Sequence, residues 1–178
     1  FTVQQFLVRE NFAKRMEAGE PIYLHETFYP LMQGYDAVAM ETDVQIGGTD
    51  QLFNILSGGR KLQEAHGQKP LVGVICGILP GTDGTQRMSK STGNIVPINT
   101  GAEDMFGKVM SIPDSAMDTY FRLVSRYTPA QIDTLIANVE SGKMHPRDAK
   151  MELGREIVSI FYGEDAAQPA QDAFIALF

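Results

Sequence analysis

The side chains best suited to chemistry lie between Pro80 and Asn94, a stretch with three glycines and no apolar periodicity that is expected to form a loop. Arg87 and Lys90 place two cations in this loop, and the Ser89 hydroxyl stands between them. Cations on a loop that can close are able to neutralise the charge that develops as a pyrophosphate group departs. The simpler alternative is a solvated basic loop without a ligand.

A second segment with binding chemistry runs from Val44 to Gln51 and predicts a short strand, a turn at Gly47 and Gly48, and the start of a helix. Glycines before a helix N-terminus bring backbone N–H groups close to a ligand. Asp50 stands in the first turn of that helix, where its carboxylate can accept hydrogen bonds from the hydroxyls of a ribose. Alternatively, Asp50 only stabilises the helix N-terminus.

A third set of polar residues has helical spacing. Tyr29, Gln33 and Asp36 stand at positions i, i+4 and i+7, which places them on one face of a helix. If that face is buried, a phenol, an amide and a carboxylate are costly unless a polar ligand or partner satisfies them. An ordinary exposed polar stripe is the alternative.

Taken in order, the three segments resemble the signatures of tyrosyl-tRNA synthetases, which are class I aminoacyl-tRNA synthetases. Residues 87–91 read Arg-Met-Ser-Lys-Ser, similar to the Lys-Met-Ser-Lys-Ser loop of that class. Arg87 replaces the usual lysine, so the charge is kept but the phosphate would meet a guanidinium fork. Residues 47–51 read Gly-Gly-Thr-Asp-Gln, similar to the family's nucleoside-binding segment, and residues 29–36 resemble its tyrosine pocket. The His-x-Gly-His signature of the class does not occur in the chain.

The resemblance implies a role for each matching residue. The residues it assigns are, for tyrosine, Tyr29, Gln33, Asp36 and Gln51; for ATP, Gly47, Gly48, Asp50, Met88, Lys90 and Ser91; and for catalysis at the phosphates, Arg87, Ser89 and Lys90. The ammonium group of tyrosine would contact Tyr29 and Gln33, its phenolic hydroxyl Asp36, and its carboxyl region Gln51.

The implied reaction is the ATP-dependent activation of tyrosine to tyrosyl-adenylate, followed by transfer to the 3′ end of tRNA(Tyr). Magnesium would arrive with ATP, and the three histidines have no metal-ligand spacing, so no protein-held metal is expected. The family also implies a homodimer, with residues 1–18 at its interface. We expect the 178-residue chain alone to be inactive. Two alternatives stay open: a tryptophanyl-tRNA synthetase-like ligase, and a non-catalytic dimerisation or RNA-binding module.

The elements that must position these residues change character near residue 100. Residues 1–99 have an α/β pattern and are interpreted as the second half of a Rossmann-like class I synthetase catalytic domain, and residues 100–178 as an all-α helical domain. One expected helix is capped by Thr27 and ends before Asp43, and another covers 49–65 and is capped by Thr49. The other expected helices cover residues 1–18, 102–110, 114–127, 129–139, 146–162 and 166–178. The expected strands are 43–46 and a buried one over 71–79.

Composition excludes several classes of protein. The chain is 43% hydrophobic, so wholesale disorder is excluded, and its net charge of −7 argues against a non-specific nucleic-acid binder. No apolar run approaches the roughly 20 residues of a membrane span. Cys76 is the only cysteine and is expected to be a small buried hydrophobe in a reduced, cytoplasmic protein.

Overall fold

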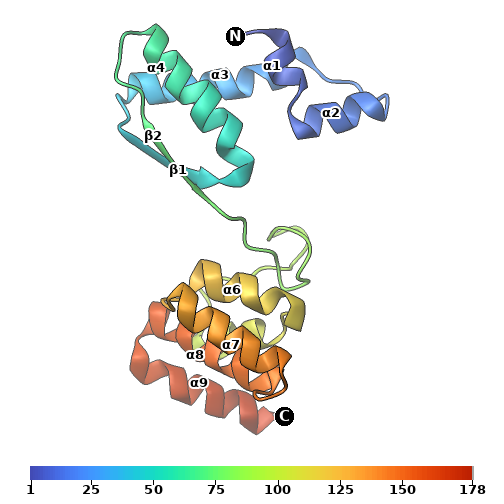
Figure 1. Cartoon of the computed structure of the whole chain (residues 1–178), viewed down its shortest axis with the longest axis vertical. Coiled ribbons are helices and arrows are strands. Elements are labelled where there is room, and N and C mark those ends of the chain that lie inside the picture. The colour runs from blue at the N-terminus through green and yellow to red at the C-terminus, as the bar shows by residue number, and fades with distance from the viewer. Residues whose placement is uncertain (178) are drawn as a thin grey trace. The chain divides into compact units, whose positions relative to one another are not determined.

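The computed structural model describes residues 1–177, apart from the side chain of Glu10. The chain forms two compact units, Phe1–Ile78 and Leu79–Phe178, which are described separately here (Figure 1). The elements of the first unit are α1 (Val3–Leu7), α2 (Glu10–Glu17), α3 (Leu24–Ala39), β1 (Val44–Gly48), the 3₁₀ turn η1 (Thr49–Gln51), the π-helical segment η2 (Phe53–Arg60), α4 (Lys61–Ala65) and β2 (Val72–Cys76).

The opening helix expected over residues 1–18 is two helices, α1 and α2. Arg9 has an extended backbone with ψ of 136° and separates them. Its guanidinium lies 5.2 Å from the ring centre of Phe12 and 5.0 Å from that of Phe53, so a cation–π contact favours the break. Gly19, with φ of 70°, follows α2 as the expected C-terminal glycine.

The two strands pair in parallel, with Val44 opposite Val72 and Gly48 opposite Cys76. Alternate residues of both strands are exposed, and Ile55 and Leu71 belong to a small core on the other face. The expectation of a buried strand containing a buried Cys76 is therefore wrong, because Cys76 shares the exposed face of β2 with Val72.

Helix α3 and segment η2 approach each other backbone to backbone. A Cβ atom on Gly34 would lie 2.7 Å from the carbonyl carbon of Gly58, and one on Gly58 would lie 2.6 Å from the carbonyl oxygen of Pro30. Gln63, which is 1% exposed, ties the C-terminal end of α3 to β2. Its amide donates to the Thr42 carbonyl at 2.9 Å and accepts from the Leu71 N–H at 2.8 Å. Thr27 lies inside α3 and does not cap it.

The second unit is helical. Its elements are α5 (Ala102–Met110), the 3₁₀ turn η3 (Asp114–Ala116), α6 (Met117–Val124), α7 (Pro129–Glu140), α8 (Pro146–Tyr162) and α9 (Glu164–Leu177). Side chains cap two of these helices: the Thr128 hydroxyl accepts from the Gln131 N–H at 3.4 Å, and His145 Nδ1 accepts from the Arg147 N–H at 3.1 Å. The helix expected over 114–127 is wrong in its bounds, since a 3₁₀ turn opens it and α6 ends at Val124.

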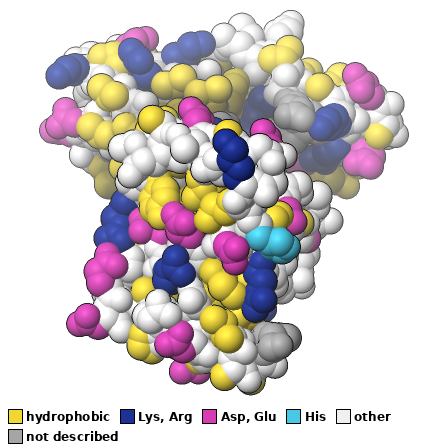
Figure 2. Space-filling view, turned by 60° about the horizontal axis from the view of Figure 1, so that its bottom comes forward, with side chains coloured by type: hydrophobic (Ala, Val, Ile, Leu, Met, Phe, Trp, Pro, Cys, Tyr) yellow, Lys and Arg dark blue, Asp and Glu magenta, His cyan; other side chains and the backbone are white. Residues whose placement is uncertain are grey.

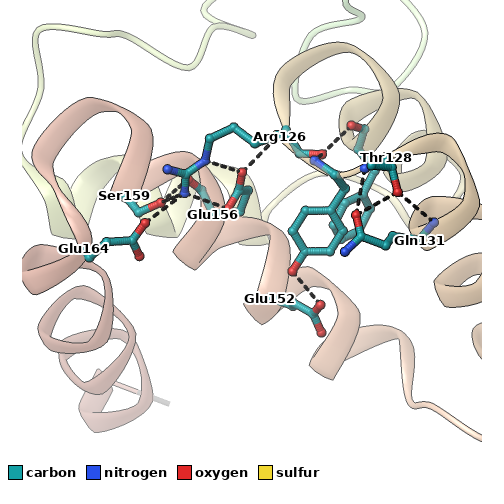
Figure 3. Close-up of polar contacts among 10 residues, drawn as sticks. Arg126, Thr128, Gln131, Glu152, Glu156, Ser159 and Glu164 are labelled. Carbon is teal, nitrogen blue, oxygen red and sulfur yellow. Dashed lines mark hydrogen bonds and ion pairs between the residues drawn. The ribbon is translucent and has the colours of Figure 1, made fainter.

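A polar network ties the turn after α6 to α8 and α9. Arg126 donates to Glu156 at 2.9 Å, to the Ser159 hydroxyl at 2.6 Å and to Glu164 at 3.0 Å (Figure 3). These pairs raise the pKa of Arg126 and lower the pKa of Glu156. The network orients helices whose packing energy comes from the apolar core behind it.

The loop before residue 95 belongs to the helical unit, whereas the sequence placed the boundary at 99/100. Leu79 and Met88 pack against the helical core, and the buried Tyr120 donates its hydroxyl to the Pro80 carbonyl at 2.8 Å. The division between the two units therefore falls before this loop, between Ile78 and Leu79. The interpretation of residues 1–99 as half of a catalytic domain stays a prediction.

Candidate functional site

Helix α3 presents Tyr29, Gln33 and Asp36 on one face, as their spacing predicts. Tyr29 is 60% exposed and Asp36 is also exposed, so this face is open in the chain. Asp36 borders an open groove of about 470 Å³. The other residues that line the groove are Phe28, Leu31, Met32 and Tyr35.

Gln33 and Gln51, which come from α3 and η1, meet at one buried amide. Asn54 is 2% exposed, and its Nδ2 group donates to Gln33 Oε1 at 3.2 Å and to Gln51 Oε1 at 3.1 Å. Among the described residues, Asn54 Oδ1 is buried and has no hydrogen-bond partner. The sequence reasoning missed Asn54. Its position three residues after Gln51, within reach on a helical turn, was the available signal.

Gly47 and Gly48 end strand β1 instead of forming the predicted turn. A Cβ atom on Gly48 would lie 2.8 Å from Oδ1 of Asp50, and one on Gly47 would lie 2.8 Å from a methyl carbon of Ile55. The lack of a side chain at Gly48 thus lets the Asp50 carboxylate fold back over the strand end. Thr49 does not cap the following helix, because the preceding Gly48 takes the N-cap position and no side chain caps it.

The loop of the second unit is organised by Asp83 and Asn94. Asp83 Oδ1 accepts from the backbone N–H of Thr85 at 2.8 Å and from that of Gln86 at 2.6 Å, and Asp83 Oδ2 accepts from the Asn94 amide. The Asn94 amide and these backbone groups hold the pKa of Asp83 well below its usual range. Lys90, in the same loop, is exposed.

The predicted site residues fall in both units. Those of the first unit are Tyr29, Gln33, Asp36, Gly47, Gly48, Asp50 and Gln51, and those of the second are Arg87, Met88, Ser89, Lys90 and Ser91. Within the second group, the hydroxyl oxygens of Ser89 and Ser91 lie 2.8 Å apart, and the Met88 side chain packs against the helical core.

A family model described as tRNA synthetases class I (W and Y) matches residues 1–178. The chain belongs to this family. The resemblance drawn from the three motifs is thereby confirmed at the level of the family, whose letters cover both tryptophan and tyrosine enzymes.

Individual relatives are similar over the whole chain. The tyrosine–tRNA ligase of Carboxydothermus hydrogenoformans is 47% identical over 178 residues, which are 100% of this chain and 43% of the relative. The tyrosine–tRNA ligase of Moorella thermoacetica is 48% identical over 177 residues, 99% of this chain and 43% of the relative. This class I synthetase chain therefore spans less than half the length of the curated relatives it matches.

Solved structures support the fold. A C-terminally truncated mitochondrial tyrosyl-tRNA synthetase of Aspergillus nidulans matches with a TM-score of 0.66 at 21% identity, covering 100% of this chain and 52% of that one. A tyrosyl-tRNA synthetase of Archaeoglobus fulgidus complexed with L-tyrosine matches with a TM-score of 0.62 at 21% identity, covering 95% of this chain and 61% of that one. A partial α/β fold joined to helices is thus the class I synthetase arrangement.

Three further findings concern the charges, the metal-binding side chains and the helices of the chain. On the face drawn in Figure 2, Lys and Arg side chains are interspersed with acidic and hydrophobic ones and do not gather into one dense patch. Over the part of the chain that the structure describes, no group of three or more His, Cys, Asp or Glu side chains is placed to hold a metal ion. Within the same residues, no helix combines the length and the apolar character needed to cross a membrane.

Proposed function

We propose that the chain contributes to a tyrosine–tRNA ligase that activates tyrosine with ATP and transfers it to tRNA(Tyr). The observation that carries the proposal is the meeting of Gln33 and Gln51 on Asn54. Two motif residues that are 18 positions apart in the sequence share one buried donor, as is expected of side chains that line a single polar pocket. The relatives that match the whole chain at about 47% identity are tyrosine–tRNA ligases.

The tyrosine end of the pocket is proposed to lie along α3 and η1. Asn54 occupies the Oε1 atoms of Gln33 and Gln51, which orients both amides. Asp36 would accept the hydrogen bond of the substrate's phenolic hydroxyl, and Tyr29 with Gln33 would bind its ammonium group. The apolar side chains of the groove beside Asp36 suit an aromatic ring.

The residues assigned to ATP are proposed for each unit separately. Gly47, Gly48 and Asp50 would bind the ribose, and the loop with Met88, Lys90 and Ser91 would cover the nucleotide. The amino acid's own carboxylate attacks the α-phosphate, so the protein needs no nucleophile. Catalysis is then positioning and charge stabilisation. Arg87, Ser89 and Lys90 would meet the pyrophosphate as it departs, and magnesium would come with ATP. A homodimer in the cytoplasm is part of the same proposal.

Replacing Lys90 by alanine in the complete ligase tests this division of labour. Because the lysine meets charge that grows only as pyrophosphate departs, Lys90→Ala should slow ATP–pyrophosphate exchange and leave tyrosine affinity unchanged. Lys143→Ala, at another exposed lysine in the turn after α7, is the matched control and should change neither the exchange rate nor the tyrosine affinity. Tyrosine binding that collapses together with the rate would make the loop a structural element and remove it from the chemistry.

A further inference from the structure

Asn94 is a buried side chain whose hydrogen-bonding capacity is fully used inside the loop. It is 7% exposed. Its Oδ1 accepts from the Ser89 N–H at 2.8 Å and from the Thr92 hydroxyl at 2.7 Å. Its Nδ2 donates to the Arg87 carbonyl at 3.2 Å and to the Asp83 carboxylate. A carboxamide has two donors and two acceptor sites, so all four are satisfied here.

Two of these partners are backbone groups of Arg87 and Ser89, which are among the residues assigned to catalysis. The Arg87 carbonyl and the Ser89 N–H lie on either side of Met88, and Asn94 holds both through one carboxamide. The backbone is thereby fixed, while the side chains of Arg87 and Lys90 are exposed to solvent. A fixed backbone with exposed cationic side chains is the arrangement expected of a pre-organised phosphate-binding loop.

Asp83 sets the orientation of that carboxamide. An asparagine side chain can be turned over, exchanging its oxygen and nitrogen, unless its partners distinguish them. A carboxylate can only accept, so Asp83 Oδ2 pairs with Nδ2 of Asn94 and not with its Oδ1, while the backbone N–H groups of Thr85 and Gln86 hold Asp83 in place. Asp83 therefore directs Oδ1 toward the Ser89 N–H.

The loop has no room for a side chain at the crossing point. A Cβ atom on Gly81 would lie 2.6 Å from the carbonyl oxygen of Asn94. The Gly81 N–H donates to the Gln86 carbonyl at 2.6 Å, and the Thr82 N–H donates to the Asn94 carbonyl at 2.9 Å. The start of the loop is thus held against its end at Asn94, and the Tyr120 hydroxyl anchors the same start at Pro80.

We propose that Asn94 and Asp83 are positioning residues of the adenylation step: Asn94 holds the Arg87–Ser89 backbone, and Asp83 orients Asn94. This role rests on the proposed function, because it acts through Arg87, Ser89 and Lys90 on the departing pyrophosphate. Neither residue touches the substrate, so tyrosine binding is independent of both.

The test is tyrosine-dependent ATP–pyrophosphate exchange by the complete ligase, with the parent, Asn94→Ala and Asn99→Ala compared. Asn94→Ala should lower kcat by about 10- to 100-fold, the loss typical of a misplaced catalytic group, while the KM for tyrosine is unchanged. Asn99→Ala, an exposed asparagine of the same connection, should match the parent.

An exchange of partners separates orientation from bulk packing. Asn94→Asp alone places two carboxylates together and should lower kcat, and Asp83→Asn alone should allow the carboxamide to turn over. The double variant Asp83→Asn with Asn94→Asp restores one amide–carboxylate pair in reverse. It should recover part of the kcat lost in Asn94→Asp, with the remaining loss due to the Arg87 carbonyl, which keeps no donor.

The structural claim is measured separately by hydrogen–deuterium exchange on the 178-residue chain. The Ser89 amide should exchange faster in Asn94→Ala than in the parent, because its acceptor is gone.

A parent ligase without tyrosine-dependent ATP–pyrophosphate exchange would overturn the proposed function. If the parent catalyses ATP–pyrophosphate exchange and Asn94→Ala is equally fast, the positioning role alone is overturned. The same holds if the KM of Asn94→Ala for tyrosine rises in step with the loss of rate.

Discussion

At the scale of single residues, the feature that unites the first unit's site is a shared donor. The Asn54 Nδ2 group serves two glutamines, and Asn54 Oδ1 is buried without a partner among the described residues. A buried acceptor without a donor costs free energy, and proteins retain such groups where binding or catalysis uses them. We therefore propose Asn54 as a residue of the same pocket, although no motif reasoning singled it out.

Removing the Asn54 amide should loosen both glutamines. Asn54→Ala is expected to lower the free energy of unfolding by about 1–3 kcal/mol, because two partly buried acceptors lose their donor. In the complete ligase it should also raise the KM for tyrosine. Urea unfolding followed by circular dichroism and steady-state exchange kinetics measure the two effects. A variant with unchanged stability and unchanged KM would show that the amide contacts do not organise the pocket.

Asp36 is the residue on which specificity rests in the proposal. When phenylalanine binds, no hydroxyl reaches the carboxylate. Asp36→Ala should therefore lower kcat/KM for tyrosine more than kcat/KM for phenylalanine. The loss of kcat/KM for tyrosine should be about 10- to 100-fold, the value of a hydrogen bond to a charged group. Asp36→Asn should be milder, since its amide oxygen still accepts. Unchanged discrimination between the two amino acids in Asp36→Ala would remove Asp36 from the tyrosine pocket.

At the scale of elements, the contact between α3 and η2 positions the α3 face that carries Tyr29, Gln33 and Asp36. The glycine contact brings the backbones together, so the Gln33 side chain on α3 comes within reach of Asn54 on η2. The π-helical turn of η2 is itself a geometry that recurs near functional sites. The same contact makes the unit sensitive to a single methyl group.

Gly34→Ala and Gly107→Ala form a matched pair with opposite expected signs. At Gly34 the added Cβ meets backbone atoms at 2.7 Å, which cannot move aside as a side chain would, so we expect a net destabilisation of about 1–3 kcal/mol. At Gly107 in α5 nothing lies within 4 Å, so alanine should stabilise by about 0.5–1 kcal/mol through helix propensity. Urea unfolding of each variant measures the change in the free energy of unfolding. A neutral Gly34→Ala would mean that the two elements are not closely packed.

The anchor between Tyr120 and the loop predicts a pH dependence. Burial, aided by the Asp83 charge, raises the pKa of Tyr120 from 10.0 to about 12. The unfolded chain therefore releases this proton first as pH rises. The contribution of Tyr120 to stability is complete below pH 10 and is lost as the pH rises toward 12, by on the order of 1–2 kcal/mol.

Tyr120→Phe isolates this effect. At pH 7 the variant should be less stable by about 1 kcal/mol, since the bond to the Pro80 carbonyl is lost. The gap between parent and variant should then narrow between about pH 10 and 12, measured by urea unfolding at each pH. Curves that stay parallel over this range would show that the folded and unfolded states share one pKa for Tyr120.

At the scale of the whole chain, local signals predicted the helical unit better than the first unit. Thr128, His145 and Gly163 mark helix ends through contacts within one turn, so α7 and α8 were predicted nearly to the residue. The break at Arg9 is aided by the ring of Phe53, which comes from η2, and the exposure of Cys76 depends on which face of the sheet the helices cover. Such tertiary causes leave no periodic trace in the sequence.

The same division holds for the candidate site. Arg87, Lys90, Asp50 and Gln33 have residue types and spacing that indicate chemistry directly. Asn54, Asp83 and Asn94 act by holding other groups in place, and their partners lie up to 21 positions away, as for Asn54 and Gln33. Their contribution becomes visible only when the hydrogen bonds of the folded chain are known.

The central claim is that this chain forms part of an enzyme that activates tyrosine. Amino-acid-dependent ATP–pyrophosphate exchange by the complete ligase tests it most directly, with tyrosine, tryptophan and phenylalanine compared at equal concentration. We expect rapid exchange with tyrosine and little with the other two amino acids, because only the tyrosine hydroxyl satisfies Asp36. Exchange supported by tryptophan in preference to tyrosine, or by no amino acid, would contradict it.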